Sequence, residues 1–293
     1  MTLDNCSLQI VNSLGQIETQ LDYPIGAYTR YKTGGNARLA IFPKTENELK
    51  TAVQTLKGFM PYEVIGAGTN LLVSDKGYNG AVIITKNLQE VRLSGNLYIA
   101  ESGVKLSSVI KDANLNSLGG LEFAIGIPAS VGGAVCMNAG CFGKSVGDYV
   151  RYVVTDRGTY SRNDCEFGYR TSKFKQEKQA IIKVCFSLNP CESDILEEKI
   201  KNYSAMRRNP RGKSCGSVFK NEGYFAGRVI DECGFKGYKI GGARVSPEHA
   251  NFIIASDSAT SQNIYDLIKV IKEKVYEKRQ ISLTEELVYL GEF

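Results

Sequence analysis

The chain has 293 residues, of which 43% are hydrophobic and 23% charged, and its formal net charge is +5. These are ordinary values for a globular protein, and they argue against a disordered or collagen-like chain. Basic residues are scattered along the sequence except for one cluster, which comprises Arg207, Arg208, Arg211 and Lys213. The cluster has no aromatic platform for stacking bases, so it suits a small anionic ligand better than a nucleic acid.

The eight cysteines and the single histidine argue against a zinc site, because no two cysteines form a C-x-x-C pair. Reduced thiols are the simpler interpretation, so we expect a cytoplasmic protein without a bound metal. Residues 1–23 contain no Lys or Arg and no continuous apolar stretch, and therefore lack the parts of a signal peptide. The longest uncharged run, 123–143, contains Pro128 and five glycines, which predicts a loop and not a membrane span.

The first predicted element is a helix over about 45–57. Thr45 and Glu48 have the spacing of a capping box, and apolar residues recur after them at helical spacing. Short apolar runs bounded by turn residues follow, and they predict strands at 62–65, 71–73 and 81–84.

A second block carries the same mixture of elements. A strand at 97–100 precedes a helix whose apolar face contains Leu106 and Ile110. Asp156-Arg157-Gly158 lies between β-type residues, which predicts a hairpin over 152–160, and another strand is predicted at 180–188. Both blocks are α+β, and we expect them to share one ligand.

Asn189-Pro190 marks a predicted boundary. Beyond it, Ser193 is the expected N-cap of a helix with Leu196, Ile200 and Tyr203 on one face. The next long helix and the final strand are predicted from apolar residues at 264, 268, 271 and 275 and from the run 287–290. We expect the strand to rejoin a sheet.

Two glycine-rich loops carry the strongest functional signal. The first, Gly66-Ala67-Gly68-Thr69-Asn70, directly follows a predicted strand, and its glycines allow consecutive backbone amides to turn inward around an anion. The second, Gly126 to Gly140, has neither the Gly-Lys-Ser/Thr of a Walker A loop nor the G-x-G-x-x-G that opens a Rossmann helix. Either loop alone could be a structural turn. Their occurrence in one chain favours a bound dinucleotide.

Six motifs occur in order along the chain. They are Tyr31-Lys32-Thr33-Gly34-Gly35, GAGTNLLV at 66–73, the loop 126–140, Phe167-Gly168-Tyr169-Arg170, GSVFKN at 216–221 and HANFI at 249–253. Together they resemble the UDP-N-acetylenolpyruvoylglucosamine reductase (MurB) family, from about Pro24 to Gly291. The short run from Arg170 to Ile181 resembles the shorter class of this family, which lacks an inserted loop carrying a substrate-stacking tyrosine.

The resemblance implies an α+β fold, with an FAD-binding fold of the vanillyl-alcohol-oxidase (PCMH) type in two subdomains and an α+β substrate-binding domain. The expected segments are FAD-binding subdomain 1 at 1–88, subdomain 2 at 89–190, the substrate-binding domain at 191–282, and a C-terminal strand at 283–293 that returns to the FAD-binding region.

The resemblance also implies a reaction. NADPH would reduce bound FAD, and hydride would then pass to the enol ether of UDP-N-acetylenolpyruvoylglucosamine, giving UDP-N-acetylmuramate for peptidoglycan synthesis. We expect a monomer whose partners are these small molecules, with no nucleic acid and no membrane among them.

Three catalytic residues follow from the same comparison. Arg170 would face the carboxylate of the substrate, which suits its planar guanidinium. Ser217 would protonate the α-carbon, and because a hydroxyl is a weak acid it would need help from a neighbour such as Lys220 or from a water chain. Glu286 would hydrogen-bond the enolic intermediate. Without the family, these residues would be interpreted as a surface arginine, a turn serine and a solvated acid at a strand edge.

The other site residues implied by the resemblance bind the cofactor or the substrate. The cofactor-binding residues are Gly66, Ala67, Gly68, Thr69, Asn70, Leu71, Gly126, Ile127, Pro128, Ala129, Ser130, Gly132, Gly133, Asn138 and Gly140. The substrate-binding residues are Arg208, Lys220, Asn221, His249 and Asn251. We expect His249, the only histidine, to orient a loop beside the substrate and not to transfer a proton.

Three positions depart from the family pattern. Ala129 stands where glycine is usual, Thr284 where an acid is usual, and Val288 where an arginine that would contact the flavin is usual. Alanine at 129 costs about 1 kcal/mol or more only if the backbone there has positive φ. Two other functions stay open: a related flavin reductase or oxidase that acts on another nucleotide sugar or enol, and a non-catalytic nucleotide-binding or sensor protein.

Overall fold

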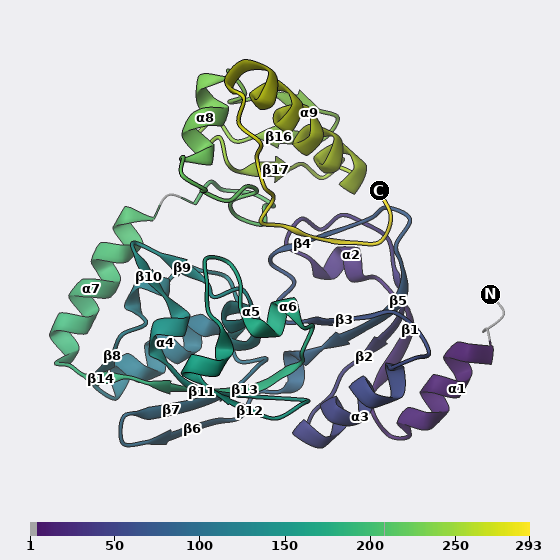
Figure 1. Cartoon of the computed structure of the whole chain (residues 1–293), viewed down its shortest axis with the longest axis vertical. Helices are drawn as coiled ribbons and strands as arrows, with labels where there is room; N and C mark the ends of the chain where they lie inside the picture. Colours follow the sequence, from purple (N-terminus) through teal and green to yellow (C-terminus); the bar gives the residue numbers. More distant parts are fainter. Residues whose placement is uncertain (1–4, 208) are drawn as a thin grey trace. The chain divides into compact units, whose positions relative to one another are not determined.

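The structure is a computed structural model that describes residues 5–207 and 209–293. The described chain forms two compact units (Figure 1). The first unit comprises residues 5–21, 39–67 and 80–207, and the second comprises residues 22–38, 68–79 and 209–293. Each unit has a hydrophobic core built from its own residues.

An antiparallel five-stranded sheet with the order β12-β11-β13-β7-β6 lies in the first unit. Its strands are β6 (Val91–Ser94), β7 (Leu97–Glu101), β11 (Val150–Thr155), β12 (Thr159–Ser161) and β13 (Ile181–Ser187). At its centre Val184 pairs with Ala100 of β7 on one side and with Val153 of β11 on the other. The predicted strands and the predicted hairpin of this block are therefore confirmed.

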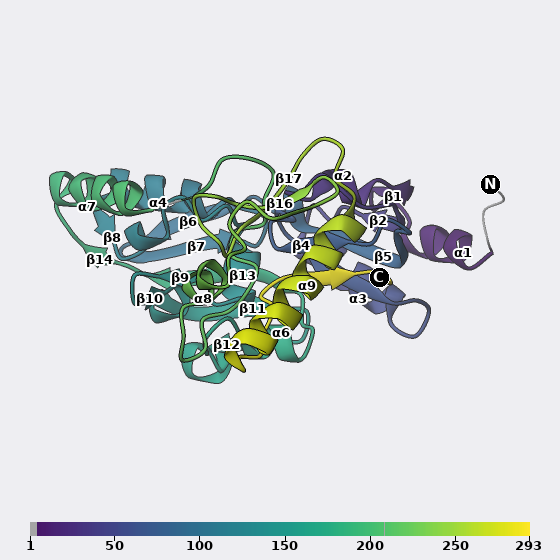
Figure 2. The ribbon, with the colours of Figure 1, turned by 90° about the horizontal axis from the view of Figure 1, so that it is seen from above.

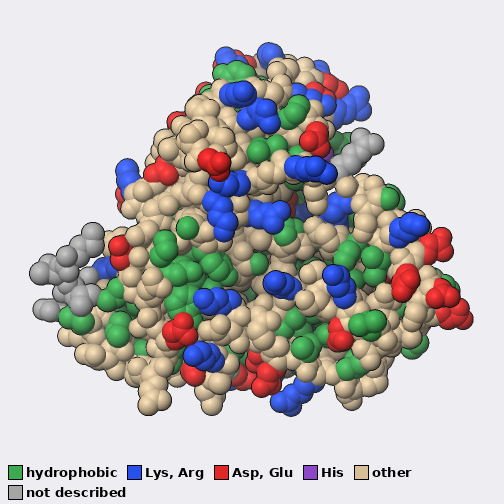
Figure 3. Space-filling model, turned by 180° about the vertical axis from the view of Figure 1, so that it is seen from behind, with side chains coloured by type: hydrophobic (Ala, Val, Ile, Leu, Met, Phe, Trp, Pro, Cys, Tyr) green, Lys and Arg blue, Asp and Glu red, His purple; other side chains and the backbone are tan. Residues whose placement is uncertain are grey.

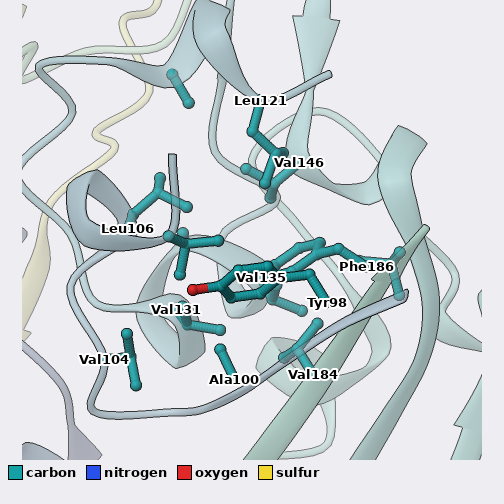
Figure 4. Close-up of a cluster of buried hydrophobic side chains, with 14 of the residues drawn as sticks. Tyr98, Ala100, Val104, Leu106, Leu121, Val131, Val135, Val146, Val184 and Phe186 are labelled. Atoms are coloured by element: carbon teal, nitrogen blue, oxygen red, sulfur yellow. The ribbon is translucent and has the colours of Figure 1, made fainter. Parts of the chain in front are cut away.

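Two helices contribute to the core on this sheet, α4 (Leu106–Leu115) and α5 (Val131–Cys136). Figure 4 shows Val131 and Val135 of α5 beside Tyr98 and Phe186 of the sheet. All four side chains are at most 1% exposed. The predicted loop over 123–143 therefore contains a short buried helix that its glycine content did not indicate.

The second sheet of this unit has the order β1-β2-β5-β3, and β3 runs parallel to β5. Its strands are β1 (Thr19–Tyr23), β2 (Ala37–Ile41), β3 (Tyr62–Ile65) and β5 (Tyr78–Ile84), and its core also takes in α1 (Asn5–Leu14) and α3 (Glu46–Leu56). Thr45 caps α3 as predicted, because its side chain accepts a bond from Glu48 N. The Glu48 carboxylate binds Lys44 N at 2.7 Å and not Thr45 N, so only half of the predicted capping box forms.

The first unit also contains α7 (Ser193–Met206), which packs on η2 (Glu122–Ala124) and α4. The predicted N-cap is wrong, since Glu192 occupies that position and makes no side-chain cap. The Ser193 hydroxyl instead lies 3.3 Å from that of Ser117. The remaining short elements of this unit are η1 (Thr85–Asn87), β8 (Leu118–Gly119), β9 (Gly140–Cys141), β10 (Lys144–Ser145), η3 (Val146–Tyr149), η4 (Arg162–Cys165), α6 (Lys173–Gln176) and β14 (Asn189–Pro190).

The second unit contains a three-stranded sheet and the parallel pair β4–β18. Its elements are α2 (Ile25–Tyr28), β4 (Leu71–Val73), α8 (Ala226–Glu232), β15 (Lys239–Ile240), β16 (Ala243–Val245), β17 (Ile253–Ala255), α9 (Ser261–Arg279) and β18 (Val288–Leu290). Figure 2 shows α9 over most of its length, with the C-terminal segment in yellow. The predicted C-terminal strand thus pairs with the strand that follows the first glycine-rich loop.

Helix α9 confirms the second long helix predicted from the sequence. Its predicted apolar face is fully buried, at Ile264, Ile268, Ile271 and Val275. Its first turn binds the Asp75 carboxylate, which accepts bonds from two helix N–H groups at 2.9 and 2.8 Å. A carboxylate in this place stabilises the helix, because the unpaired N–H groups carry partial positive charge.

The predicted domain boundaries after residues 88, 190 and 282 stay a prediction. Helix α7, which the sequence placed in the third segment, belongs to the first compact unit. Both units show basic and acidic side chains on the face in Figure 3. Across the described residues, every helix is too short or too polar to cross a bilayer.

Candidate cofactor and substrate site

The two glycine-rich loops meet at Gly66 and Ser130. Gly66 directly follows β3, and Ser130 is the N-cap of α5, where its hydroxyl accepts a bond from Gly133 N at 3.3 Å. A methyl group on Gly66 would overlap the Ser130 hydroxyl, so the approach requires glycine. The start of the first loop, Gly66, is therefore in contact with the second loop within the first unit, although the two are far apart in the sequence.

The first loop offers a row of backbone donors. The consecutive N–H groups of residues 67–70 donate no hydrogen bond to any residue in the described ranges 5–207 and 209–293. Gly68 has φ of +63°, which turns the backbone within this row. Consecutive amides left unpaired around such a turn form an anion-binding nest, so this segment fits the diphosphate of a dinucleotide.

The second loop uses several of its amides to fix its own position. Val131 N donates to Val104 O at 2.8 Å, and Gly132 N donates to Ser102 O at 2.9 Å. Leu106 N donates in turn to Ala129 O at 2.9 Å, so the loop pairs with the segment that enters α4. These bonds fix the loop beside Gly66, and no pattern in the sequence predicts the segment with which it pairs. Phosphate binding by its residues stays a prediction.

Asn138 connects the second loop to the turn that carries Arg170. Its side chain is almost fully buried, accepts a bond from Gly147 N at 3.0 Å, and donates one to Gly168 O at 2.9 Å. The Ser172 hydroxyl donates to Cys136 O at 2.7 Å on the other side of the turn. The turn before and after Arg170 is thereby fixed to the glycine-rich loop.

Arg170 has a backbone conformation that most residues avoid. Its φ is +55°, in the left-handed region, and Lys175 Nζ donates to its carbonyl at 3.2 Å. Its guanidinium lies 5.1 Å from the ring of Tyr169. Strained residues of this kind persist where the surrounding structure fixes them, and they occur often at functional sites.

Ser217 and Glu286 lie in neighbouring segments of the second unit. Glu286 N donates to Val218 O at 2.7 Å, and Lys220 N donates to Thr284 O at 2.9 Å. The Asn70 side chain donates to Glu286 O at 2.9 Å, which joins the end of the first glycine-rich loop to the same segment. The structure therefore brings together two of the three predicted catalytic residues within one unit.

The adjacent glutamates 285 and 286 have different surroundings. The Glu285 carboxylate binds Lys272 Nζ at 2.7 Å. The Glu285 carboxylate is therefore engaged by a lysine of α9. That Glu286, and not Glu285, hydrogen-bonds the enolic intermediate stays a prediction.

Asn251 and His249 hold the Ser217 segment in place. The Asn251 side chain is 2% exposed, accepts a bond from Phe219 N at 2.9 Å and donates one to Phe219 O at 2.8 Å. His249 Nδ1 accepts a bond from Asn251 N at 3.2 Å, and burial lowers the pKa of His249 below its ordinary value. His249 Nδ1 therefore acts as a hydrogen-bond acceptor within this loop, and a role for His249 in orienting the loop beside the substrate stays a prediction.

The remaining predicted substrate residues also lie in this unit. The Lys220 side chain is 21% exposed, and its ammonium lies 3.9 Å from the Glu222 carboxylate. The Asn221 side chain accepts a bond from Ala226 N at 2.9 Å, which folds the turn before α8. Arg208 lies outside the described residues. Contact of any of these side chains with substrate stays a prediction.

Two of the departures from the family pattern have clear surroundings. Ala129 is absent from the described residues with positive φ, so a glycine is not required there. Val288 N donates to Asn70 O at 3.0 Å, and Val288 pairs with Leu71 in the β4–β18 ladder. Position 288, where the family pattern predicts an arginine, therefore lies beside the end of the first glycine-rich loop.

Comparison with known proteins first defines a class. Residues 37–162 match a family model described as an FAD binding domain, and these residues include both β3 and the Gly126–Gly140 loop. The chain is thus a flavoprotein of the FAD-dependent oxidoreductase class, and the predicted FAD-binding fold of the PCMH type is confirmed.

The family follows from the rest of the chain. Residues 208–290 match the model of the UDP-N-acetylenolpyruvoylglucosamine reductase C-terminal domain. The reductase of that name from Caldicellulosiruptor bescii is 40% identical over 289 residues, which cover 94% of this chain and 92% of the relative. The one from Alkaliphilus oremlandii is 38% identical over 283 residues, covering 93% of each chain.

A solved structure agrees with these matches. The crystal structure of the UDP-N-acetylenolpyruvylglucosamine reductase (MurB) from Thermus caldophilus has a TM-score of 0.82 and 32% identity, and it covers 94% of this chain and 99% of that chain. The chain belongs to the UDP-N-acetylenolpyruvoylglucosamine reductase (MurB) family. Its length of 293 residues is consistent with the shorter class.

The contact between the loops predicts the effect of changing Gly66. Gly66→Ala should lower the free energy of unfolding by about 1 to 3 kcal/mol and reduce bound FAD, because the new methyl overlaps the Ser130 hydroxyl. Adding Ser130→Ala removes that hydroxyl and should restore much of both. Denaturant unfolding and the flavin absorbance per protein measure the two effects.

Gly133→Ala is a matched control for this experiment. Its methyl would lie at an ordinary 3.4 Å from the same hydroxyl, within a helix that tolerates alanine, so we expect no loss of stability. A Gly66→Ala protein with wild-type stability and flavin content would contradict the proposed contact.

The side-chain pairing of Asn251 predicts a second effect. Asn251→Ala leaves the buried N–H and C=O of Phe219 without partners, so it should destabilise the protein by about 2 to 4 kcal/mol. Denaturant unfolding measures this change. Asn163→Ala is the control, because Asn163 is exposed, and it should change stability by no more than about 0.5 kcal/mol. Equal effects of the two substitutions would show that the Asn251 bonds contribute little.

Proposed function

We propose that this chain reduces UDP-N-acetylenolpyruvoylglucosamine to UDP-N-acetylmuramate in peptidoglycan precursor synthesis, with bound FAD and with NADPH as the hydride donor. The observation that carries the proposal is 40% identity to a reductase of that name over 94% of the chain. The nest of unpaired amides at residues 67–70 supports FAD as the bound dinucleotide.

The bound flavin would supply the redox chemistry, accepting hydride from NADPH and delivering it to the β-carbon of the enolpyruvyl group. The protein must then stabilise the negative charge that develops on the carboxylate of the substrate. Arg170 is suited to this task, because a guanidinium offers two parallel N–H donors to a carboxylate. Its fixed turn would keep it in position before the charge develops.

Ser217 would donate the proton that completes the reduction at the α-carbon. Its hydroxyl makes no hydrogen bond to the described part of the chain, so it is available to a substrate. Lys220 lies three residues further on and carries a positive charge that favours loss of the proton. Glu286 belongs to the neighbouring segment and would hydrogen-bond the enolic intermediate.

The UDP part of the substrate would bind to basic and amide groups of the second unit. Lys220 and Asn221 are the described candidates, and Arg208 is the candidate outside the described residues. A lysine ammonium binds phosphate as a point charge, and an arginine can add a two-point contact. The Asn251 side chain binds the backbone of Phe219, directly before Lys220, and His249 in turn binds the backbone N–H of Asn251.

The two half-reactions can be followed separately by the colour of the flavin. The purified protein should show an oxidised-flavin spectrum that NADPH bleaches and that UDP-N-acetylenolpyruvoylglucosamine restores under anaerobic conditions. Restoration by oxygen alone would favour the alternative of an oxidase. Restoration by another enol or nucleotide sugar would favour a related reductase, and a protein that binds no FAD would contradict both.

Ser217→Ala separates the proton donor from the hydride transfer to flavin. The variant should bleach with NADPH at close to the wild-type rate, because the hydroxyl takes no part in that step. Turnover of the sugar should fall by about 10²-fold or more, since general acid catalysis contributes roughly that much. Stopped-flow absorbance measures both rates. Equal losses in the two half-reactions would exclude Ser217 as the proton donor.

A further inference from the structure

Arg207 brings α7 to the start of the Gly126–Gly140 loop. It is the C-cap of α7, and its backbone N–H donates to Ser204 O at 3.3 Å. Helix α7 packs on η2, the short turn that leads into the loop. The Arg207 side chain therefore emerges from a helix that is already attached to the loop.

The guanidinium of Arg207 contacts both ends of this loop. Its Nη2 donates to Phe123 O at 3.1 Å and to Cys141 Sγ at 2.9 Å. Phe123 precedes the loop and Cys141 follows it. The Cys141 thiol also donates to Phe123 O at 2.9 Å, so the three groups close the loop across its base.

Two further contacts fix the position of the Arg207 side chain. Its Cζ lies 5.6 Å from the ring of Phe142, which itself stacks on Tyr203 of α7 at 5.2 Å. Gly126 has φ of +79°, and a methyl group there would come within 2.9 Å of Arg207 Cδ. The first glycine of the loop thus makes room for the arginine.

Arg207 also introduces a positive charge without an anionic partner. Within residues 5–207 and 209–293 its partners are a carbonyl oxygen, a thiol and an aromatic ring. Its Nε is buried and makes no hydrogen bond to the same part of the chain. A half-buried positive charge with a buried, unbonded N–H is stabilised when a counter-charge approaches it. An anionic ligand at the loop would supply that counter-charge.

We propose that Arg207 is a positioning residue for the flavin, which closes the base of the Gly126–Gly140 loop and favours the diphosphate by its charge. This inference rests on the proposed FAD-dependent function. A loop whose two ends are already joined loses less conformational entropy when a ligand orders it, and therefore binds that ligand more tightly. Arg207 was considered in the sequence only as part of a basic cluster, because its contacts with residues 123 and 141 have no local signature.

Three variants of the full chain test the proposal. Arg207→Met keeps the length of the apolar stem without the charge, and Arg207→Lys keeps the charge with a shorter reach. Arg92→Met is the control, because Arg92 is an exposed arginine of the same unit whose guanidinium pairs with Glu90 at 3.3 Å. Flavin fluorescence measures the FAD dissociation constant of each apo-protein at two salt concentrations, and denaturant unfolding gives its stability without FAD.

Arg207→Met should weaken FAD binding by about tenfold or more, and Arg207→Lys by clearly less. The salt dependence of FAD binding should become shallower in Arg207→Met only, because that variant alone among the Arg207 changes loses the charge. Arg92→Met should bind FAD as the wild type does. Wild-type affinity in Arg207→Met, or a lysine variant no better than methionine, would overturn the proposal.

Cys141→Ala adds a test of the contact itself. It should weaken FAD binding severalfold in the wild type and add little to Arg207→Met, because the two residues share one hydrogen bond. Fully additive effects would show that Arg207 acts without closing the loop. A wild-type protein that binds no FAD would refute the proposed function. If the wild type binds FAD and Arg207→Met binds it with the same dissociation constant, only this inference is refuted.

Discussion

The site depends on the close approach of Gly66 to Ser130, because that contact joins the start of the first glycine-rich loop to the second loop within the first unit. Ser130 can occupy this place only because it caps α5, and α5 is fixed by Val131 and Val135 in the core of the five-stranded sheet. A side chain at 66 would separate the loops by pushing against a helix that cannot move without opening that core. The position of Gly66, where the first loop begins, is thus determined by the packing of the sheet.

Three asparagine side chains hold the backbone at or beside the three predicted catalytic residues through hydrogen bonds. Asn138 binds the carbonyl of Gly168 before Arg170, Asn251 binds both backbone groups of Phe219 after Ser217, and Asn70 binds the carbonyl of Glu286. None of these catalytic residues lies inside a helix or a strand. A carboxamide has both donors and an acceptor, so it can replace the missing ladder of a sheet and hold an irregular backbone.

The sequence predicted those parts of the fold that have a local signature. The apolar periodicity of α9 and the turn residues between β11 and β12 each depend on residues that are neighbours in the chain. The pairing of Val131 with Val104 and the clamp of Asn251 on Phe219 join residues that are distant in the sequence, and no periodicity records them. For the same reason the sequence did not predict that the Asn138 and Asn251 side chains bind the backbone, and their predicted ligand contacts stay predictions. The predicted N-cap of α7 is wrong for a similar reason. Ser193 has a suitable hydroxyl, but that hydroxyl lies beside the hydroxyl of Ser117, a residue distant in the sequence.

A site held through its backbone tolerates changes in side chains. Ala129 replaces a glycine at a position without positive φ, and its carbonyl still accepts the bond from Leu106 N, so the wall of the cofactor site is unchanged. Position 288 carries valine where the family pattern predicts an arginine, and its N–H binds Asn70 O while its strand pairs with β4. The segment that carries Glu286 is therefore held by backbone contacts that do not need an arginine at 288. The unpaired N–H groups of residues 67–70 are backbone groups too, so their capacity to bind a diphosphate does not depend on the side chain at 288.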